Sequence, residues 1–210
     1  MILLGIDEAG RGSIIGPMIV AGVIVEDHKA DLLAKLGVKD SKKLTRRKRE
    51  ELFKLIAYYS VSVIVVKVLP QDIDRENLNE LTYDSVIKII QLSLPYRPSK
   101  ITVDKVGKEE RVIEFIKEIG SEANVVHNAD VLFPECSAAS IVAKVIRDKV
   151  TDTLKEIYGD FGSGYPGDSK TISWIKSTYS RADKPPPIIR RSWKILQEIA
   201  PNYYISKHGH

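Results

Sequence analysis

Two adjacent acids close the first apolar segment of the chain. The run Ile2–Ile6 leads directly into Asp7 and Glu8, and a Gly-Arg-Gly triplet follows at residues 10–12. A carboxylate at the end of a buried strand loses hydration, so it needs a nearby cation or its pKa rises. Glycines let the backbone approach a bulky ligand closely. The combination indicates a metal ion beside a phosphate or nucleic-acid ligand.

Two further acids stand at comparable places. Asp104 follows the apolar run Ile101–Val103, and Asp130 follows Val125–Val126. If these strands are neighbours in one sheet, their ends meet at one edge, where carboxylates about 4 Å apart repel by roughly 4 kcal/mol at an effective dielectric near 20. Taken singly, an acid after a strand is usually a turn residue, and successive residues such as Asp7 and Glu8 converge only if the strand bends. Together the four acids predict a shared cation site.

The predicted cation is Mg²⁺ or Mn²⁺. The chain has one cysteine, Cys136, and four scattered histidines without the spacing of a zinc site, at positions 28, 127, 208 and 210. Hard divalent cations prefer carboxylate and water oxygens. Two such ions can activate a water and stabilise the leaving oxygen when a phosphodiester is hydrolysed. This chemistry needs no covalent enzyme intermediate.

Composition restricts the class of protein. The 210 residues are 43% hydrophobic and 29% charged, which predicts one globular domain with at most a small appendage. The net charge is only +4, but the pI near 9.0 and local clusters of basic residues favour a polyanionic partner. The single cysteine, the lack of a basic leader and the short apolar runs predict a cytoplasmic protein without a membrane segment. We expect a monomer.

The spacing of apolar residues predicts the elements that must hold the acids. Five β-branched runs are expected to be strands: Ile2–Ile6, Met18–Val25, Val61–Val68, Ile101–Val103 and Val125–Val126. Helices are expected after the N-cap Thr45, from Pro70 to Ile90, from Lys108 to Ile119 and from Pro134 to Tyr158. The pattern predicts an α/β fold with a mixed five-stranded sheet flanked by helices.

The composition changes after Gly159. A glycine-rich loop at 162–167 precedes a helix that Asp168 or Ser169 can cap, and the triple proline 185–187 separates it from a last helix. We therefore expect a catalytic core over residues 1–159 and a C-terminal helical lid over residues 160–210.

Four motifs, taken together, resemble ribonuclease HII of the archaeal branch. They are Gly5–Gly12, Asp40–Leu44, Ser137–Ile141 with Ala143–Val145, and Gly162–Pro166. Their occurrence in this order across nearly the whole chain is far more specific than any single motif. The resemblance implies a ribonuclease H-like fold and hydrolysis of the RNA strand of RNA–DNA hybrids. It also implies cutting 5′ of ribonucleotides embedded in duplex DNA, leaving 3′-hydroxyl and 5′-phosphate ends.

The resemblance also assigns residues. It matches the four acids to the catalytic, metal-binding set, and it matches Gly10, Arg11 and Gly12 to a loop whose main chain contacts the ribose 2′-hydroxyl. Tyr165 matches a tyrosine that stacks at the RNA-to-DNA junction. Only the 2′-hydroxyl distinguishes RNA from DNA locally. Lys105, after the third acid, stands where small residues are more usual in the family and could change metal affinity.

A basic segment supplies further candidates. Residues 42–49 carry six lysines and arginines around the start of a helix, which could clamp phosphates or form a solvated face. The resemblance favours contacts with the phosphate backbone by Ser41, Lys42, Lys43 and Arg47, with Lys144 and Arg147 as similar candidates on the long helix.

Three alternatives remain open. A nuclease of the same fold could cut DNA and ignore the 2′-hydroxyl, or the protein could bind hybrids without cutting them and use the acids to hold a structural ion. The tail Gln197–Tyr204 resembles a sliding-clamp docking peptide. A small residue, Ala200, and the following Pro201 favour a structural helix end instead, so any clamp contact is expected to be weak.

Overall fold

The computed structural model describes residues 1–207, so His208 and His210 lie outside the described residues. Contacts between Cα atoms divide the chain into two compact units. Unit 1 comprises Met1–Ala9, Ile19–Val66 and Thr82–Ile146, and unit 2 comprises Gly10–Met18, Lys67–Leu81 and Arg147–His210. The predicted division after residue 159 stays a prediction.

A five-stranded sheet with the order β3-β2-β1-β4-β5 forms the centre of unit 1. The central strand β1 is antiparallel to β2 and parallel to β4, and β4 is parallel to β5. The predicted mixed five-stranded sheet is therefore confirmed. The strands are β1 (Ile2–Ala9), β2 (Met18–Glu26), β3 (Ser62–Val68), β4 (Lys100–Asp104) and β5 (Glu122–Val126).

The register of the parallel strands decides where the acids lie. Ile6 of β1 is paired with Val103 of β4, and Asp104 is paired with Val126 of β5. The carboxyl ends of β1, β4 and β5 therefore reach the same edge of the sheet. This confirms the expected arrangement of the strand ends, which requires no long loop to bring the acids near one another.

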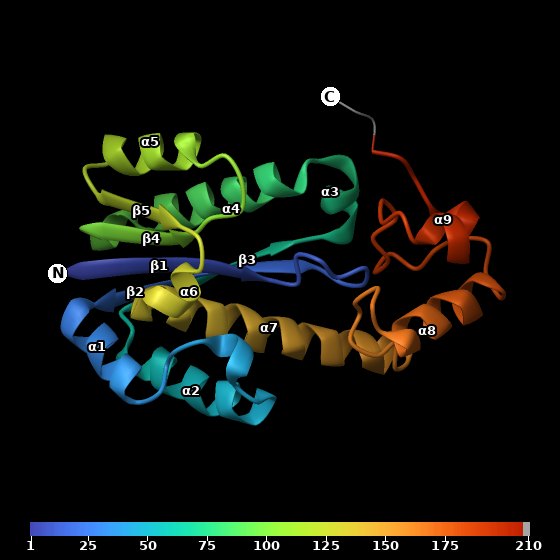
Figure 1. Ribbon diagram of the computed structural model, residues 1–210, viewed down its shortest axis with the longest axis horizontal. Helices are drawn as coiled ribbons and strands as arrows, with labels where there is room; N and C mark the ends of the chain where they lie inside the picture. Colours follow the sequence, from blue (N-terminus) through green and yellow to red (C-terminus); the bar gives the residue numbers. More distant parts are fainter. Residues whose placement is uncertain (208–210) are drawn as a thin grey trace. The chain divides into compact units, whose positions relative to one another are not determined.

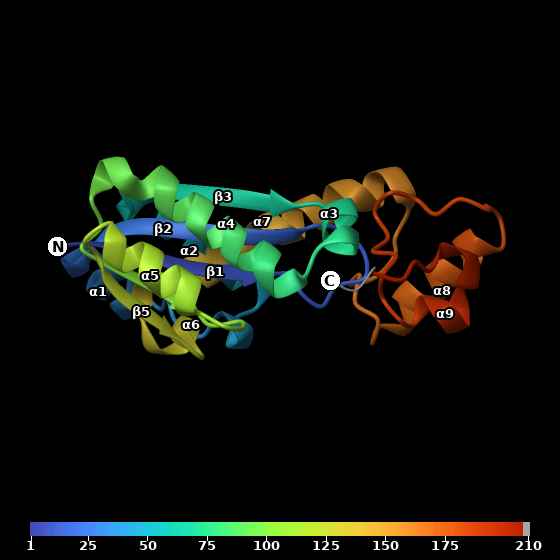
Figure 2. The same ribbon diagram turned by 90° about the horizontal axis from the view of Figure 1, so that it is seen from above.

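Helices cover both faces of this sheet. Figures 1 and 2 show α4 (Leu78–Ser93) and α5 (Glu110–Glu118) on one face. On the other face lie α1 (Asp27–Lys35), α2 (Arg46–Tyr59) and the first part of α7 (Pro134–Tyr158). A sheet covered on both faces needs continuously apolar strands, and every residue of β2 before Glu26 is buried.

The start of α7 packs directly on β1 and β4. A Cβ atom on Gly5 would lie 2.1 Å from the carbonyl carbon of Glu135, so only glycine permits this approach. The Cys136 thiol donates to the carbonyl of Ile6 (3.2 Å), and the Thr102 hydroxyl donates to Glu135 Oε1 (2.6 Å). These contacts fix the helix that carries Ser137, Ser140 and Lys144.

Local side-chain capping explains where α2, α4 and α8 (Ser169–Tyr179) begin. Thr45 accepts from the Lys48 amide at the start of α2, and Asp168 accepts from the Lys170 amide at the start of α8. The helix expected over 70–90 is instead two helices, α3 (Pro70–Arg75) and α4. The cause is Asn77, whose side chain accepts from two amides of the first turn of α4.

Two elements differ from the expectation. The sequence analysis missed α1, because only Ala30 and Leu33 of its nine residues are buried and no clear apolar face is present. The expected last helix shrinks to α9 (Leu196–Ile199) followed by a 3₁₀ turn at Pro201–Tyr203. The short α6 (Ala129–Leu132) follows β5, and Asn128 before it has a left-handed backbone.

Unit 2 has its own apolar core, in which α8 and α9 take part. Its buried residues are Ile14, Ile15, Phe161, Ile175, Ile188, Ile189, Leu196, Ala200 and Tyr203. Ile15 and Ile189 form an isolated antiparallel bridge, which joins the segment after the Gly-Arg-Gly triplet to the segment after the triple proline. Within residues 1–207 no helix has the length and apolarity needed to cross a membrane.

Candidate functional site

Three of the four predicted acids lie together at the edge of the sheet in unit 1. Asp7 of β1 and Asp130 of α6 are buried, with 6% and 1% of their surface exposed, and Asp104 at the end of β4 is half-buried. The Ala129 amide donates to Asp104 Oδ1 (2.8 Å), which ties the start of α6 to the end of β4. We call Asp7, Asp104 and Asp130 the acid cluster.

The electrostatics of the acid cluster show that its carboxylates affect one another. The pKa of Asp7 is raised from 3.8 to about 6; burial is the largest cause, Ser140 and Lys144 partly oppose it, and Asp104 adds a smaller increase. Burial also raises the pKa of Asp104, against the Ala129 hydrogen bond and with a contribution from Asp130. Asp7 and Asp104 therefore resist ionisation mainly because they are desolvated, and to a smaller extent because a neighbouring carboxylate is also negative.

Asp130 provides the test of whether a cation fits. Both of its carboxylate oxygens are buried and neither has a hydrogen-bond partner. The Nζ atom of Lys42 is 3.4 Å from Oδ2, close enough for an ion pair. A buried carboxylate without hydrogen-bond donors is costly unless a cation compensates it. An oxygen-only set of this kind fits Mg²⁺ or Mn²⁺.

Glu8 differs from the other three acids. It lies on β1 opposite Val20 of β2 in a regular pair, and its amide donates to Asp7 Oδ1 (2.8 Å). Successive side chains of a regular strand point to opposite faces, so the pairing shows no bend that would turn Glu8 toward Asp7. Among residues 1–207 no three His, Cys, Asp or Glu side chains form a complete metal-binding group. Mg²⁺ commonly keeps waters and takes substrate phosphates as its remaining ligands.

A buried polar network adjoins the acid cluster. Lys144 Nζ donates to the hydroxyls of Ser41 (2.7 Å) and Ser140 (2.8 Å), and the two hydroxyls are 2.8 Å apart. Desolvation lowers the pKa of Lys144, although Asp7 and Asp130 favour its charge. For Lys42 the attraction of Asp130 and Asp7 exceeds the effect of desolvation and raises the pKa. The Asp-Ser-Lys segment thus lies against the acids, and the buried Ser41 acts within the network.

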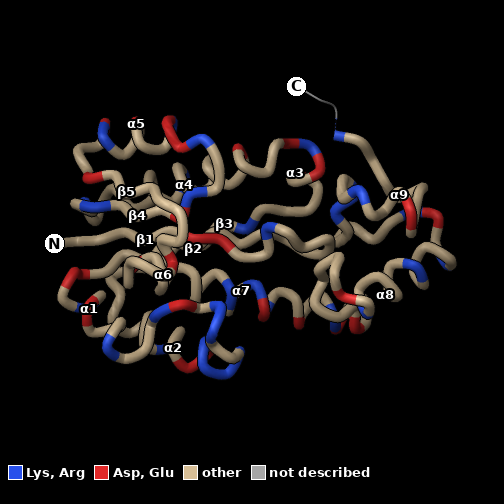
Figure 3. The backbone as a smooth tube through the Cα atoms, viewed as in Figure 1, with Lys and Arg blue, Asp and Glu red and all other residues tan. Residues whose placement is uncertain are grey.

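The other predicted basic residues of unit 1 lie on the surface. Lys43 is paired with Asp40 (2.7 Å), and Arg47 is paired with Glu51 (3.3 Å). Figure 3 shows lysines and arginines gathered around the start of α2 and acidic residues at the end of β1. Lys105 is paired with Glu109 (2.6 Å), so a carboxylate outside the acid cluster compensates its charge.

The Gly-Arg-Gly triplet lies in unit 2 with Tyr165. Gly10 has φ +81°, and a Cβ atom on it would lie 2.3 Å from Arg147 Nε, so glycine is required there. A Cβ on Gly12 would lie 3.8 Å from the Tyr165 ring. The guanidinium of Arg147 is 5.0 Å from the centre of that ring, which is 38% exposed. Arg147 also donates to Ser13 Oγ (2.7 Å), so it supports this loop from inside.

Sequence reasoning missed Arg190 of unit 2. Its side chain is fully buried and donates to three backbone carbonyls of residues 10–16. The available signal was a charged residue directly after the apolar pair Ile188–Ile189, in a segment that follows three prolines. A charge in such a place is unusual unless it is fully hydrogen-bonded.

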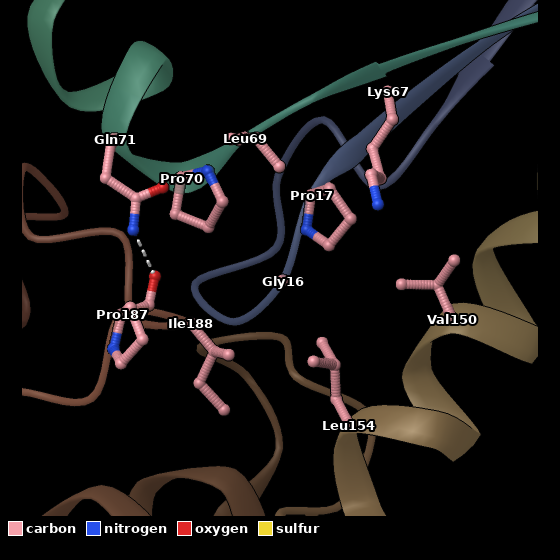
Figure 4. A pocket seen from close by; sticks show the side chains of 10 residues that line it. All are labelled: Gly16, Pro17, Lys67, Leu69, Pro70, Gln71, Val150, Leu154, Pro187 and Ile188. Carbon is pink, nitrogen blue, oxygen red and sulfur yellow. Dashed lines mark hydrogen bonds between the residues drawn. The ribbon is translucent and has the colours of Figure 1, made fainter.

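Unit 2 also contains a small apolar pocket (Figure 4). Pro17, Leu69, Val150 and Leu154 line it, and Gln71 donates to the carbonyl of Pro187 (2.7 Å) at one side. Its volume of about 210 Å³ is below the roughly 300–1,000 Å³ typical of small-molecule sites. It contains no acid that could do chemistry, so the acid cluster remains the candidate site.

The raised pKa of Asp7 predicts how stability depends on pH. A carboxyl group whose pKa is higher in the folded state destabilises the fold as pH rises from about 4 through about 6. We expect Asp7→Asn, which mimics the protonated form, to raise the free energy of unfolding at pH 7 by up to about 3 kcal/mol in metal-free buffer. The gain should disappear below pH 4. Urea unfolding at several pH values measures it.

The exposed Asp31 of α1 offers the matched control, Asp31→Asn. It should show no comparable gain at neutral pH. Equal stability of wild-type protein and Asp7→Asn at pH 7 would contradict the desolvation of Asp7.

Comparison with known proteins agrees with this geometry. The family model "Ribonuclease HII" matches residues 4–196. The ribonuclease HII of Sulfurisphaera tokodaii is 60% identical over 207 residues, covering 99% of this chain and 100% of that protein. The ribonuclease H2 structure from Pyrococcus horikoshii matches with a TM-score of 0.86 and 35% identity, covering 97% of this chain and 99% of that one.

A third similar structure is described as a PCNA:RNase HII complex from Archaeoglobus fulgidus. It has a TM-score of 0.81 and 38% identity, and the match covers 94% of this chain and 96% of that one. The expected ribonuclease H-like fold and the expected enzyme class, a metal-dependent endonuclease acting on the RNA strand of RNA–DNA hybrids, are confirmed through the family. The chain belongs to the ribonuclease HII family.

Proposed function

We propose that the acid cluster holds Mg²⁺ or Mn²⁺ and is the catalytic centre of this chain. Cleavage would fall on the 5′ side of a ribonucleotide embedded in duplex DNA and leave 3′-hydroxyl and 5′-phosphate ends. The observation that carries the proposal is Asp130, whose two buried oxygens have no hydrogen-bond partner in a group with Asp7 and Asp104. Glu8 is proposed as the fourth ligand because the family resemblance matches it to that role; its side chain leaves regular β1 on the face opposite to that of Asp7 and would have to reach the cations around the end of the strand.

The acids have a defined chemical task in this proposal. When bound, two divalent cations lower the pKa of a water and stabilise the leaving oxygen. Asp7, Asp104 and Asp130 hold the positive charge at the edge of the sheet, where their mutual repulsion favours its binding. Lys144 and Ser140 hold Asp7 in position through the buried network. No side chain has to form a bond with the substrate.

Recognition of the ribose is assigned to unit 2. Gly10, Arg11 and Gly12 would offer main-chain groups to the 2′-hydroxyl, and the exposed ring of Tyr165 would stack on the sugar or base beside it. Support comes from Gly12, which is exposed and leaves the ring uncovered. Among the basic candidates, Lys42, Lys43 and Arg47 are exposed and suited to phosphate contacts. The buried Ser41 and Arg147 would act as supports.

A duplex DNA with one embedded ribonucleotide tests the proposal. We expect incision at the ribonucleotide with Mg²⁺ or Mn²⁺, none with EDTA, and none on the matching all-DNA duplex. Asp104→Asn should lower kcat by at least about a hundredfold and leave binding of the duplex nearly unchanged. Denaturing gels of end-labelled substrate measure cleavage, and fluorescence anisotropy measures binding.

Asp84→Asn is the matched control, since Asp84 is an exposed carboxylate on α4 that pairs with Arg111. It should keep the wild-type rate. Metal-dependent cutting of all-DNA duplex would favour the DNA nuclease, and binding without cutting would favour the hybrid-binding module. A near-normal rate for Asp104→Asn would overturn the assignment of the acids.

We also propose a weak contact with a sliding clamp through the tail Gln197–Tyr204. The similar A. fulgidus protein, described in complex with PCNA, supports it. In this chain Tyr203 is fully buried in the core of unit 2, and its hydroxyl donates to the carbonyl of Ala182 (2.6 Å). A partner would therefore meet mainly the exposed Gln197 and the half-buried Tyr204, which is why we expect low affinity.

The clamp contact predicts a measurable change in affinity. Gln197→Ala with Tyr204→Ala should weaken binding of an archaeal sliding clamp by about tenfold in isothermal titration calorimetry, because the two side chains supply the exposed contacts. Glu156→Ala on α7 is an exposed control. Absence of any affinity in the intact chain would refute the contact. A monomeric state, a cytoplasmic location and a C-terminal lid remain proposals.

A further inference from the structure

We propose that Arg190 and Trp193 are positioning residues that hold the Gly10–Gly12 main chain in the orientation needed to read a ribose 2′-hydroxyl. This inference rests on the proposed function, because it assumes that the loop reads the sugar. It goes further by assigning the selectivity for ribose to residues that do not touch the substrate. Both residues belong to the segment that follows the triple proline, far from the loop in sequence.

Arg190 joins the loop to this segment through its whole guanidinium group. Nη2 donates to the carbonyl of Gly10 (2.6 Å), Nη1 to that of Arg11 (2.9 Å) and Nε to that of Gly16 (2.8 Å). The side chain has no exposed surface. A planar group with fixed donors is the only side chain that can hold three carbonyls at once in this way.

Trp193 holds the next carbonyl of the same loop. Its indole Nε1 donates to the carbonyl of Gly12 (3.3 Å), and its ring lies 5.1 Å from the Arg190 guanidinium. All three carbonyls of the Gly-Arg-Gly triplet are therefore bound by two side chains that are three residues apart.

Because the peptide bond is planar, the contacts to the loop carbonyls also fix the direction of the loop amides. None of the described peptide bonds is cis, and in a trans peptide the C=O and the following N–H point in opposite directions. When Arg190 holds the carbonyls of Gly10 and Arg11, the amides of Arg11 and Gly12 point away from it. Gly12 is exposed, so a ligand can approach the part of the loop whose amide faces away from Arg190.

The absence of a carboxylate partner argues against a purely structural ion pair. Within residues 1–207 neither Arg190 nor the neighbouring Arg147 forms an ion pair with an acid. The pKa of Arg190 is lowered to about 9, mainly by desolvation and also by the charge of Arg147, against weaker attraction from Tyr165 and Asp74. A buried cation that is held only by carbonyls is an expensive way to stabilise a core, because apolar residues of similar size would serve. We therefore assign to Arg190 the role of orienting the Gly10–Gly12 loop.

The test measures discrimination between sugars. Fluorescence anisotropy in buffer with Ca²⁺ gives two affinities, one for a duplex with one ribonucleotide and one for the matching all-DNA duplex. The ratio of the first affinity to the second measures how strongly the protein recognises the 2′-hydroxyl. Arg190→Lys keeps the charge, but its three donors share one nitrogen and cannot span the same three carbonyls, so we expect the ratio to fall by about tenfold while affinity for the DNA duplex is unchanged. Arg191→Lys is the matched control, since the side chain of Arg191 donates to the carbonyl of Tyr203, which lies outside the Gly10–Gly12 loop.

Trp193→Phe provides a second, milder variant in case Arg190→Lys does not fold. It keeps an aromatic ring over Arg190, removes the donor to Gly12, and should lower the ratio by about threefold. Thermal unfolding of each variant separates this effect from a general loss of stability. An unchanged ratio in both variants, or an equal loss on both duplexes, would overturn the inference. A wild-type ratio near one would instead refute the proposed reading of the 2′-hydroxyl.

Discussion

The fold places the carboxylates of the acid cluster in buried or half-buried positions at one edge of the sheet, and the positive charges nearby compensate only part of their negative charge. Parallel pairing of β1, β4 and β5 sets their carboxyl ends at one edge, and helix α7 packs so closely on β1 that only glycine fits at position 5. Lys42 and Lys144 compensate part of the charge, yet both oxygens of Asp130 stay without a donor. The fold therefore leaves part of the negative charge of the acid cluster uncompensated.

Unit 2 contains buried positive charge. Two buried arginines, Arg147 and Arg190, have carbonyls, a hydroxyl and aromatic rings as partners. Their guanidinium groups shape the loop of glycines rather than neutralise acids. Each unit thus contains buried charge that is not fully compensated where a ligand is proposed to bind: negative charge at the acid cluster and positive charge behind the Gly10–Gly12 loop. A nucleic acid with its divalent cations is a ligand that complements both.

The sequence was sufficient for the sheet and for the acids in it. Continuous β-branched runs marked the five strands, and an acid directly after an apolar run marked Asp7 and Asp104. Helix caps at Thr45 and Asp168 could be read locally because a side chain and an amide two or three residues away decide them. The missed α1 has too few buried residues to give a periodic signal.

Long-range polar contacts could not be read from the sequence. The Ser41–Ser140–Lys144 network joins residues about a hundred positions apart, and Arg190 binds carbonyls 174–180 positions away. Every residue has a backbone carbonyl, so no sequence motif shows which carbonyls a side chain will bind. For the same reason the sequence could not show that Ser41 is buried while Lys42 is exposed. The sequence pattern identifies charged candidate residues, but only the fold shows which groups each of them contacts.

The most direct measurement is anomalous diffraction from crystals of the protein with Mn²⁺ and an uncleavable duplex that contains one ribonucleotide. The account predicts Mn²⁺ peaks at coordination distance, about 2.0–2.3 Å, from carboxylate oxygens of Asp7, Asp104 and Asp130. Mn²⁺ bound elsewhere, with these carboxylates still without a cation, would contradict it.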